Sequence, residues 1–248
     1  MIIDGHCHAG KGDALTAPWN TTAPLAAYLK RARRAGIDAT IVCPAFHSDY
    51  VLANRELSRL IAGTSSKLIG FAMVHTSRDA GRIHEMLDEA TKRYGFRGVK
   101  VHGHDSQATR ELCDAARRFN LPVFLDVAGK AHVIDMLAPE YPDVSFIIAH
   151  LGSFADDWRA HERVVEQLAR YPNIYADTSG VRRFDYLLRA VRHAGPSKLI
   201  YGSDGPWLHP ALELQKIRLL GLPQSAEAAV LGQNAERLIL RRSAPSIA

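Results

Sequence analysis

The stretch that decides the fold is IIDGHCH, residues 2–8, close to the start of the chain. It begins with isoleucines, which predict a buried strand, and ends with two histidines. In an open, doubly wound sheet the first strand is normally followed by a glycine-rich phosphate loop. Residues 6–12 read HCHAGKG, which matches neither the dinucleotide-binding spacing nor the P-loop spacing. The stretch therefore favours a barrel over an open sheet.

Apolar runs of this kind recur along the chain, most of them roughly 20 to 35 residues apart, with segments of helical period between them. The predicted strands are Ile2–Asp4, Ala39–Cys43, Lys67–Val74, Gly98–Val101, Pro122–Asp126, Val144–Ala149, Ile174–Asp177 and Lys198–Tyr201. The predicted helices are Ala23–Ala35, Asp49–Ala62, Ala80–Tyr94, Gln107–Phe119, Lys130–Ala138, Asp156–Ala169, Phe184–Val191, Pro210–Leu220 and Ser225–Arg241. Alternation of this kind over 248 residues predicts an α/β fold, a (β/α)8 TIM barrel, with one domain over residues 1–248.

The composition narrows the class of protein. With 47% hydrophobic and 23% charged residues, the chain is expected to be globular. The net charge of +5 comes without a run of five like charges, so we expect no nucleic-acid partner. The N-terminus lacks the pattern of a signal peptide, and no apolar run approaches the roughly 18 residues of a membrane span. The three cysteines form no CxxC motif, and a cytoplasmic location is expected.

Several histidines fall at or just after the ends of predicted strands, where the active site of a barrel is built. His6 and His8 share one face of their strand, because side chains alternate, and two convergent imidazoles suit a transition metal. His150 ends an otherwise apolar run, where burial without a partner would be costly. Asp204 follows the last predicted strand and could face the first histidines across a closed barrel. Taken alone, it would be interpreted as a turn residue before Gly205.

The motifs together resemble the amidohydrolase superfamily, specifically its amidohydrolase-2 branch. The resemblance covers nearly the whole chain and rests on blocks at residues 3–8, 98–102, 121–123, 148–152, 173–180, 201–207 and 231–235. It implies a distorted (β/α)8 barrel. The branch includes metal-dependent hydrolases and non-oxidative decarboxylases of the aminocarboxymuconate-semialdehyde type.

The resemblance implies roles by position. His6 and His8 match the metal pair of the first strand, and Asp204 matches the carboxylate that binds the metal and moves a proton. His150 matches a histidine that polarises the substrate or hands on a proton. The fifth strand of this branch usually ends in a ligand histidine, and here Asp126 stands at that position. A carboxylate can still bind zinc, so Asp126 is expected as a fourth ligand, and the exchange makes manganese or magnesium more plausible.

Substrate-binding residues are expected around this centre. Lys100 and His102 share a face at the end of the fourth predicted strand. In other amidohydrolases a carboxylated lysine on that strand bridges two metals. For Lys100 we favour a contact with a substrate anion or a hydrogen bond to Asp126. Arg182 could hold a substrate carboxylate and Trp207 could form an apolar wall, although both could also be solvated loop residues.

The sequence thus predicts a metal-dependent hydrolase of a small ester, lactone or amide. It is expected to hold one divalent ion, zinc first and manganese or magnesium as alternatives. Metal-activated water would be the nucleophile, and Asp204 would be the proton shuttle. The alternative is a metal-dependent non-oxidative decarboxylase of a small unsaturated or aromatic acid. A second alternative is an inert barrel with a binding role. A small-molecule substrate is the expected partner. Because barrels of this branch often pair, the resemblance also implies a homodimer.

Overall fold

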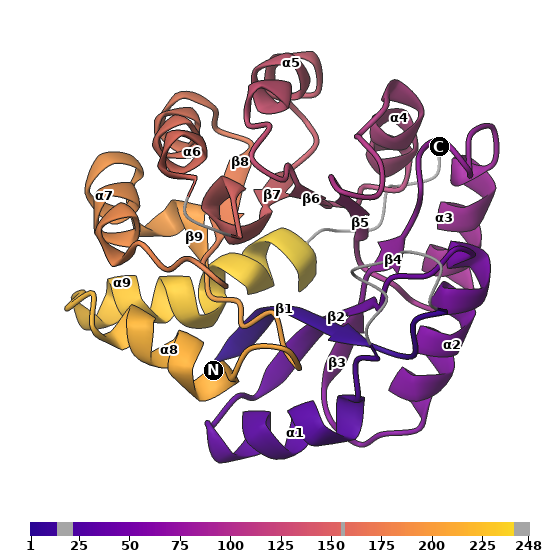
Figure 1. The fold of residues 1–248 in the computed structure, drawn as a ribbon, viewed down its shortest axis with the longest axis horizontal. Helices are drawn as coiled ribbons and strands as arrows, with labels where there is room; N and C mark the ends of the chain where they lie inside the picture. Colours follow the sequence, from indigo (N-terminus) through magenta and orange to yellow (C-terminus); the bar gives the residue numbers. More distant parts are fainter. Residues whose placement is uncertain (14–21, 155–156, 241–248) are drawn as a thin grey trace.

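The computed structural model describes residues 1–13, 22–154 and 157–240, and its strands all pair in parallel. Figure 1 shows the strands at the centre of the molecule with helices around them. One sheet has the order β1-β2-β3 and the other runs in sequence from β4 to β9. The strands are β1 (Ile3–Ala9), β2 (Ala39–Pro44), β3 (Leu68–Gly70), β4 (Ala72–Met73), β5 (Val99–His102), β6 (Val123–Asp126), β7 (Phe146–Ile148), β8 (Ile174–Asp177) and β9 (Leu199–Ile200).

Backbone hydrogen bonds join the two sheets into a closed barrel. Only Phe71 separates β3 from β4, and its N–H donates to the Val42 carbonyl over 2.9 Å, so β3 and β4 act as one barrel strand. On the other side, the Gly5 N–H donates to the Tyr201 carbonyl over 2.7 Å. The His8 N–H donates to the Gly205 carbonyl over 2.6 Å. These bonds bring β1 beside the end of β9 and confirm the predicted TIM barrel.

The helices cover the outside of the barrel much as the sequence predicts. They are α1 (Leu25–Arg34), α2 (Tyr50–Ala62), α3 (Ile83–Lys92), α4 (Arg110–Arg118), α5 (His132–Glu140), α6 (Trp158–Arg170), α7 (Phe184–Ala194), α8 (Pro210–Arg218) and α9 (Gln224–Ala228). Among the residues described, no helix has both the length and the apolar character that a bilayer crossing requires.

The prediction of one helix over Ser225–Arg241 is wrong in its detail. The α-helical part ends at Ala228, and wider π-type turns follow over Ala229–Gln233 and Glu236–Leu240. Tertiary contacts explain the change, because this segment is bonded to the last barrel strand. The Val230 carbonyl accepts the Tyr201 N–H over 2.9 Å, and the Asn234 side chain donates to the Leu199 carbonyl over 2.8 Å. Arg241, and Asp156 at the start of another predicted helix, lie outside the described residues.

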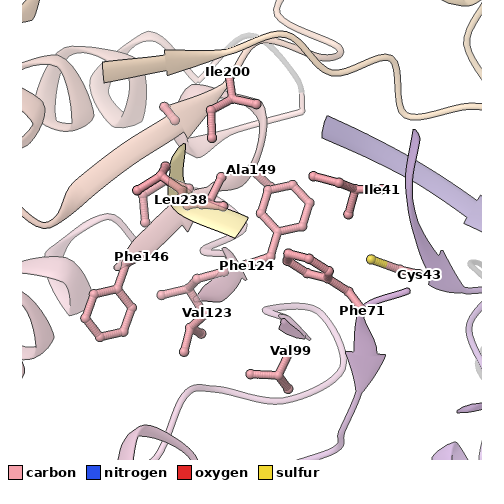
Figure 2. Close-up of a cluster of buried hydrophobic side chains, with 14 of the residues drawn as sticks. Ile41, Cys43, Phe71, Val99, Val123, Phe124, Phe146, Ala149, Ile200 and Leu238 are labelled. Atoms are coloured by element: carbon pink, nitrogen blue, oxygen red, sulfur yellow. The ribbon is translucent and has the colours of Figure 1, made fainter. Parts of the chain in front are cut away.

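The barrel interior forms the floor of the candidate site. Figure 2 shows Phe71, Phe124 and Ile41 among the buried side chains of this interior. Phe124 is buried, and the edge of its ring meets the His6 ring with 4.6 Å between centroids. Its face lies 4.9 Å from the Lys100 ammonium. The apolar core therefore ends directly against the polar side chains of the barrel mouth.

Candidate active site

His6 and His8 on β1 are held so that their Nε2 atoms converge. The Nδ1 atom of His6 lies 3.0 Å from an Asp177 carboxylate oxygen, and that of His8 lies 2.7 Å from the Pro44 carbonyl. Because these oxygens only accept, each Nδ1 carries the proton and each Nε2 presents a lone pair. The two Nε2 atoms are 3.3 Å apart. Burial, and then the charge of Lys100, hold the pKa of both histidines well below the usual range, so both are neutral.

Asp204 completes this group from the other end of the chain. Its Oδ1 atom lies 3.5 Å from His6 Nε2 and 3.7 Å from His8 Nε2. Its own N–H donates to the His6 carbonyl over 2.7 Å, and its φ of 52° lies in the left-handed region. Burial raises the pKa of the carboxyl to about 7. His6, His8 and Asp204 together could hold a metal ion.

A glycine allows β1 and β8 to approach each other at this point. A Cβ atom on Gly202 would lie 2.6 Å from an Asp177 carboxylate oxygen and 3.0 Å from the His6 Cβ. Real Cβ contacts are almost never shorter than 3.0 Å. The absence of a side chain at Gly202 therefore permits the bond between Asp177 and His6, which fixes the imidazole for metal binding.

His150 lies beside the first group, on strained backbone. Its Nδ1 atom lies 2.9 Å from the Ser179 carbonyl, so Nδ1 carries the proton, and its ring centroid is 5.0 Å from that of His6. His150 and Leu151 have φ values of 55° and 49°, in a region that costs energy for a side chain such as leucine. The His161 Nδ1 atom holds the Leu151 carbonyl over 3.0 Å. His6, His150 and Asp177 form a second set of possible metal ligands.

Asp126 lies outside both of these sets of possible ligands. In the register of β5 and β6 it is the partner of His102, and His102 Nε2 lies 2.9 Å from its carboxylate. Its other oxygen accepts the Ala128 N–H over 2.7 Å. Burial alone would raise the pKa of Asp126, but the charge and hydrogen bond of His102 outweigh it and lower that pKa. Burial is the largest influence on His102 and lowers the pKa of its imidazole, while Asp126 opposes this shift.

Lys100 takes a place that the sequence did not predict. Its side chain is fully buried, and its Nζ atom contacts His6 Nε2 and lies 2.9 Å from His8 Nε2. The converging lone pairs thus already surround a cation, and this supports the fit of a metal ion to the same atoms.

Aromatic side chains form a wall next to these groups. The Trp207 ring lies 4.7 Å from the His8 ring, and the Phe46 ring lies 4.5 Å from that of His102. Phe154 meets His150 edge-on at 5.0 Å. Trp207 therefore lies beside one of the two converging imidazoles. The Arg182 side chain is exposed.

The sequence reasoning assigned no role to Asp177 and Ser179, which connect His6 to His150. Asp177 accepts from the His6 ring and from the His150 N–H over 3.1 Å. The Ser179 hydroxyl lies 3.1 Å from His6 Nδ1 and 3.0 Å from His150 Nδ1. Both residues follow or end β8, so their position at a strand end was the available signal.

A family comparison accounts for this arrangement of strand-end residues. A model of the amidohydrolase family matches residues 3–240. The chain belongs to the amidohydrolase family. A comparison with curated proteins found no match to this sequence.

Solved structures share the fold of this amidohydrolase at low sequence identity. One is an amidohydrolase from Burkholderia multivorans with bound zinc, 16% identical, covering 96% of this chain and 98% of that chain with a TM-score of 0.80. Another is a dihydroxybenzoic acid decarboxylase from Polaromonas with bound manganese, 16% identical, covering 98% of both chains with a TM-score of 0.73. A candidate 2-pyrone-4,6-dicarboxylic acid hydrolase from Pseudomonas putida is 22% identical, covering 96% of both chains with a TM-score of 0.72.

Proposed function

We propose that the protein is a metal-dependent hydrolase that cleaves a small ester, lactone or amide. The observation that carries this proposal is the position of the Asp204 carboxyl, whose Oδ1 atom lies 3.5 Å from His6 Nε2 and 3.7 Å from His8 Nε2. A carboxyl at that position can accept a proton from a water molecule beside the imidazoles and return a proton to a leaving group. Hydrolysis requires such a group, because a proton leaves the attacking water and another reaches the leaving group.

In this proposal His6 Nε2, His8 Nε2 and an Asp204 oxygen hold one divalent ion. When bound, such an ion polarises a carbonyl and lowers the pKa of water. Two imidazoles and one carboxylate suit zinc, with manganese or magnesium as alternatives. The zinc and the manganese in two structures of the same fold support a divalent ion in this site.

The side chains around the group have separate tasks. Asp204 accepts the proton of the attacking water and delivers a proton to the leaving group. His150 keeps its Nδ1 proton on the Ser179 carbonyl, so Nε2 is the atom that meets the substrate, and it stabilises the oxygen on which charge develops. Trp207 forms the apolar wall, while His102 and Arg182 contact the polar groups of the substrate.

The second candidate is decarboxylation of a small unsaturated or aromatic acid. The same Asp204 supports it, because a carboxyl beside the two imidazoles can, once protonated, deliver a proton to carbon. A structure of the same fold is a dihydroxybenzoic acid decarboxylase. The two reactions differ in their product, since only decarboxylation releases carbon dioxide.

The test is a panel of small lactones, esters, amides and aromatic acids, incubated with the zinc-loaded and manganese-loaded protein. Acid release is followed by titration and carbon dioxide by gas analysis. We expect ester or lactone cleavage, lost in His6→Ala and kept in the control His84→Gln, which changes an exposed imidazole on α3. Carbon dioxide without cleavage would assign the decarboxylase. Equal behaviour of His6→Ala and the wild type would favour the inert barrel.

The cytoplasmic location, the single domain over residues 1–248 and the homodimer remain predictions from the sequence.

A further inference from the structure

A buried ammonium group lies against the two imidazoles that would bind the ion. Lys100 is fully buried, its Nζ atom contacts His6 Nε2, and it lies 2.9 Å from His8 Nε2. Both imidazoles carry their proton on Nδ1, so the only lone pair of each ring is on Nε2. Lys100 therefore uses the same two lone pairs that a divalent ion needs.

The surroundings hold the ammonium in this position. The face of Phe124 lies 4.9 Å from Nζ on one side, and a cation over an aromatic face is stabilised by the charge distribution of the ring. Asp204 Oδ1 is close to the same pair of Nε2 atoms, at 3.5 and 3.7 Å. Phe124, the imidazoles and the carboxyl thus form a site for one cation.

Two cations cannot share this site. One lone pair on each imidazole binds either a proton donor or a metal, and charges of like sign repel strongly where water is excluded. We propose that Lys100 is an internal competitor of the metal: the ion binds His6, His8 and Asp204 only when the ammonium leaves the Nε2 atoms. This rests on the metal site of the proposed function but not on its hydrolytic reaction.

The competition has two consequences for the site. The metal binds more weakly than its three ligands alone would allow, because displacement of Lys100 is part of the binding equilibrium. Metal binding also releases the ammonium from the imidazoles, and it is then available to an anionic group of the substrate. The affinity for the ion and the contact with the substrate are therefore coupled through one side chain.

A carboxylated lysine would behave in the opposite way. If Lys100 carried a carboxylate and bound the metal, its replacement would remove a ligand and weaken binding. If Lys100 is a competitor, its replacement by a neutral side chain strengthens binding. The sign of the change in metal affinity separates the two roles.

The experiment compares Lys100→Met with Lys100→Arg. Each protein is stripped with a chelator, checked by its melting temperature, and titrated with zinc against a chromophoric chelator. Lys100→Met is expected to bind zinc at least about tenfold more tightly than the wild type. Lys100→Arg keeps the charge and is expected to bind no more tightly than the wild type. Lys92→Met, which changes an exposed lysine, is the matched control.

Weaker zinc binding by Lys100→Met, or an affinity within about threefold of the wild type, would overturn the proposal. Lys100→Gln is titrated in the same way if Lys100→Met does not fold, with the same expected sign. The hydrolase proposal fails on a different measurement, the absence of product from the zinc-loaded protein. Tighter binding by Lys100→Met would stand even in that case.

Discussion

Two aspartates at the mouth of the barrel, Asp126 and Asp204, are both buried, yet their surroundings act on them in opposite directions. Asp126 accepts from the His102 ring and from the Ala128 N–H, and its pKa is lowered. Asp204 Oδ1 faces lone pairs at 3.5 and 3.7 Å, and burial raises its pKa to about 7. Burial alone therefore does not set the charge of a carboxyl; the hydrogen-bond donors around it do. Of the two, the carboxyl whose pKa is raised towards neutrality is the better suited to proton transfer.

Different parts of the fold bring the two aspartates to the mouth of the barrel. Asp126 meets His102 because β5 and β6 are neighbours in register. Asp204 meets His6 only because the barrel closes between β1 and the end of β9. One group thus depends on local pairing and the other on the whole fold.

The largest expected effect is on catalysis, where the variants of the two aspartates should differ. Asp204→Asn is expected to lower the kcat of hydrolysis by about 1,000-fold, because it removes the group that moves the proton. Asp126→Asn is expected to lower it by less than about tenfold, since Asp126 only holds His102. Steady-state kinetics of the zinc-loaded proteins measures both. Similar losses in the two variants would contradict the division of roles.

The second expected effect is on the free energy of unfolding, and it has opposite signs for the variants of the two aspartates. The folded-state pKa of Asp204, about 7, lies above the ordinary value of 3.8. Its contribution to the free energy of unfolding is therefore fully present below pH 3.8 and is lost as the pH rises through about 7. In chelator at pH 8, Asp204→Asn is therefore expected to be more stable than the wild type by up to about 4 kcal/mol. Denaturant unfolding should show this gain shrinking below pH 7 and vanishing near pH 4.

Asp126 gives the opposite sign in the same measurement. The folded-state pKa of Asp126 is lowered from the ordinary value of 3.8. Its contribution to the free energy of unfolding is therefore present above pH 3.8 and is lost only as the pH falls through the lowered folded-state pKa. Asp126→Asn is expected to be less stable than the wild type at pH 7 by about 1–3 kcal/mol. A destabilised Asp204→Asn or a stabilised Asp126→Asn at that pH would refute the contrast.

A smaller effect is expected for Asp177, whose carboxylate accepts from His6 Nδ1. Asp177→Asn keeps an oxygen that can accept from His6 Nδ1 but loses the negative charge. The zinc affinity should fall about 10- to 100-fold. Zinc titration against a chelator measures it, with the exposed Asp143→Asn as control. An unchanged affinity would show that Asp177 does not orient the imidazole.

The sequence was enough to predict the barrel and to place the two histidines of its first strand side by side. Apolar runs at barrel spacing require strands, and alternation puts His6 and His8 on one face. The partner of Asp126 was not predictable, because it depends on the register between β5 and β6, which the individual runs do not reveal. The sequence equally could not show the Lys100 ammonium against the imidazoles, since several rotamers of a long side chain fit a strand end.

The left-handed backbone at His150 and Leu151 is another feature that the sequence could not predict. Neither residue favours this conformation by itself, and the structure keeps it through contacts with residues distant in the sequence. The His150 N–H is held by Asp177 and the Leu151 carbonyl by His161. Conformations of this kind follow from tertiary contacts rather than from local preference.

The central claim is that His6, His8 and Asp204 hold one divalent ion, with Asp126 outside its ligand set. The most direct test is the zinc content of protein dialysed against dilute zinc, compared among the wild type, His6→Ala/His8→Ala and Asp126→Asn. We predict about one ion per chain in the wild type and in Asp126→Asn, and almost none in the double variant. Retention of the ion by the double variant, or its loss from Asp126→Asn, would contradict the account.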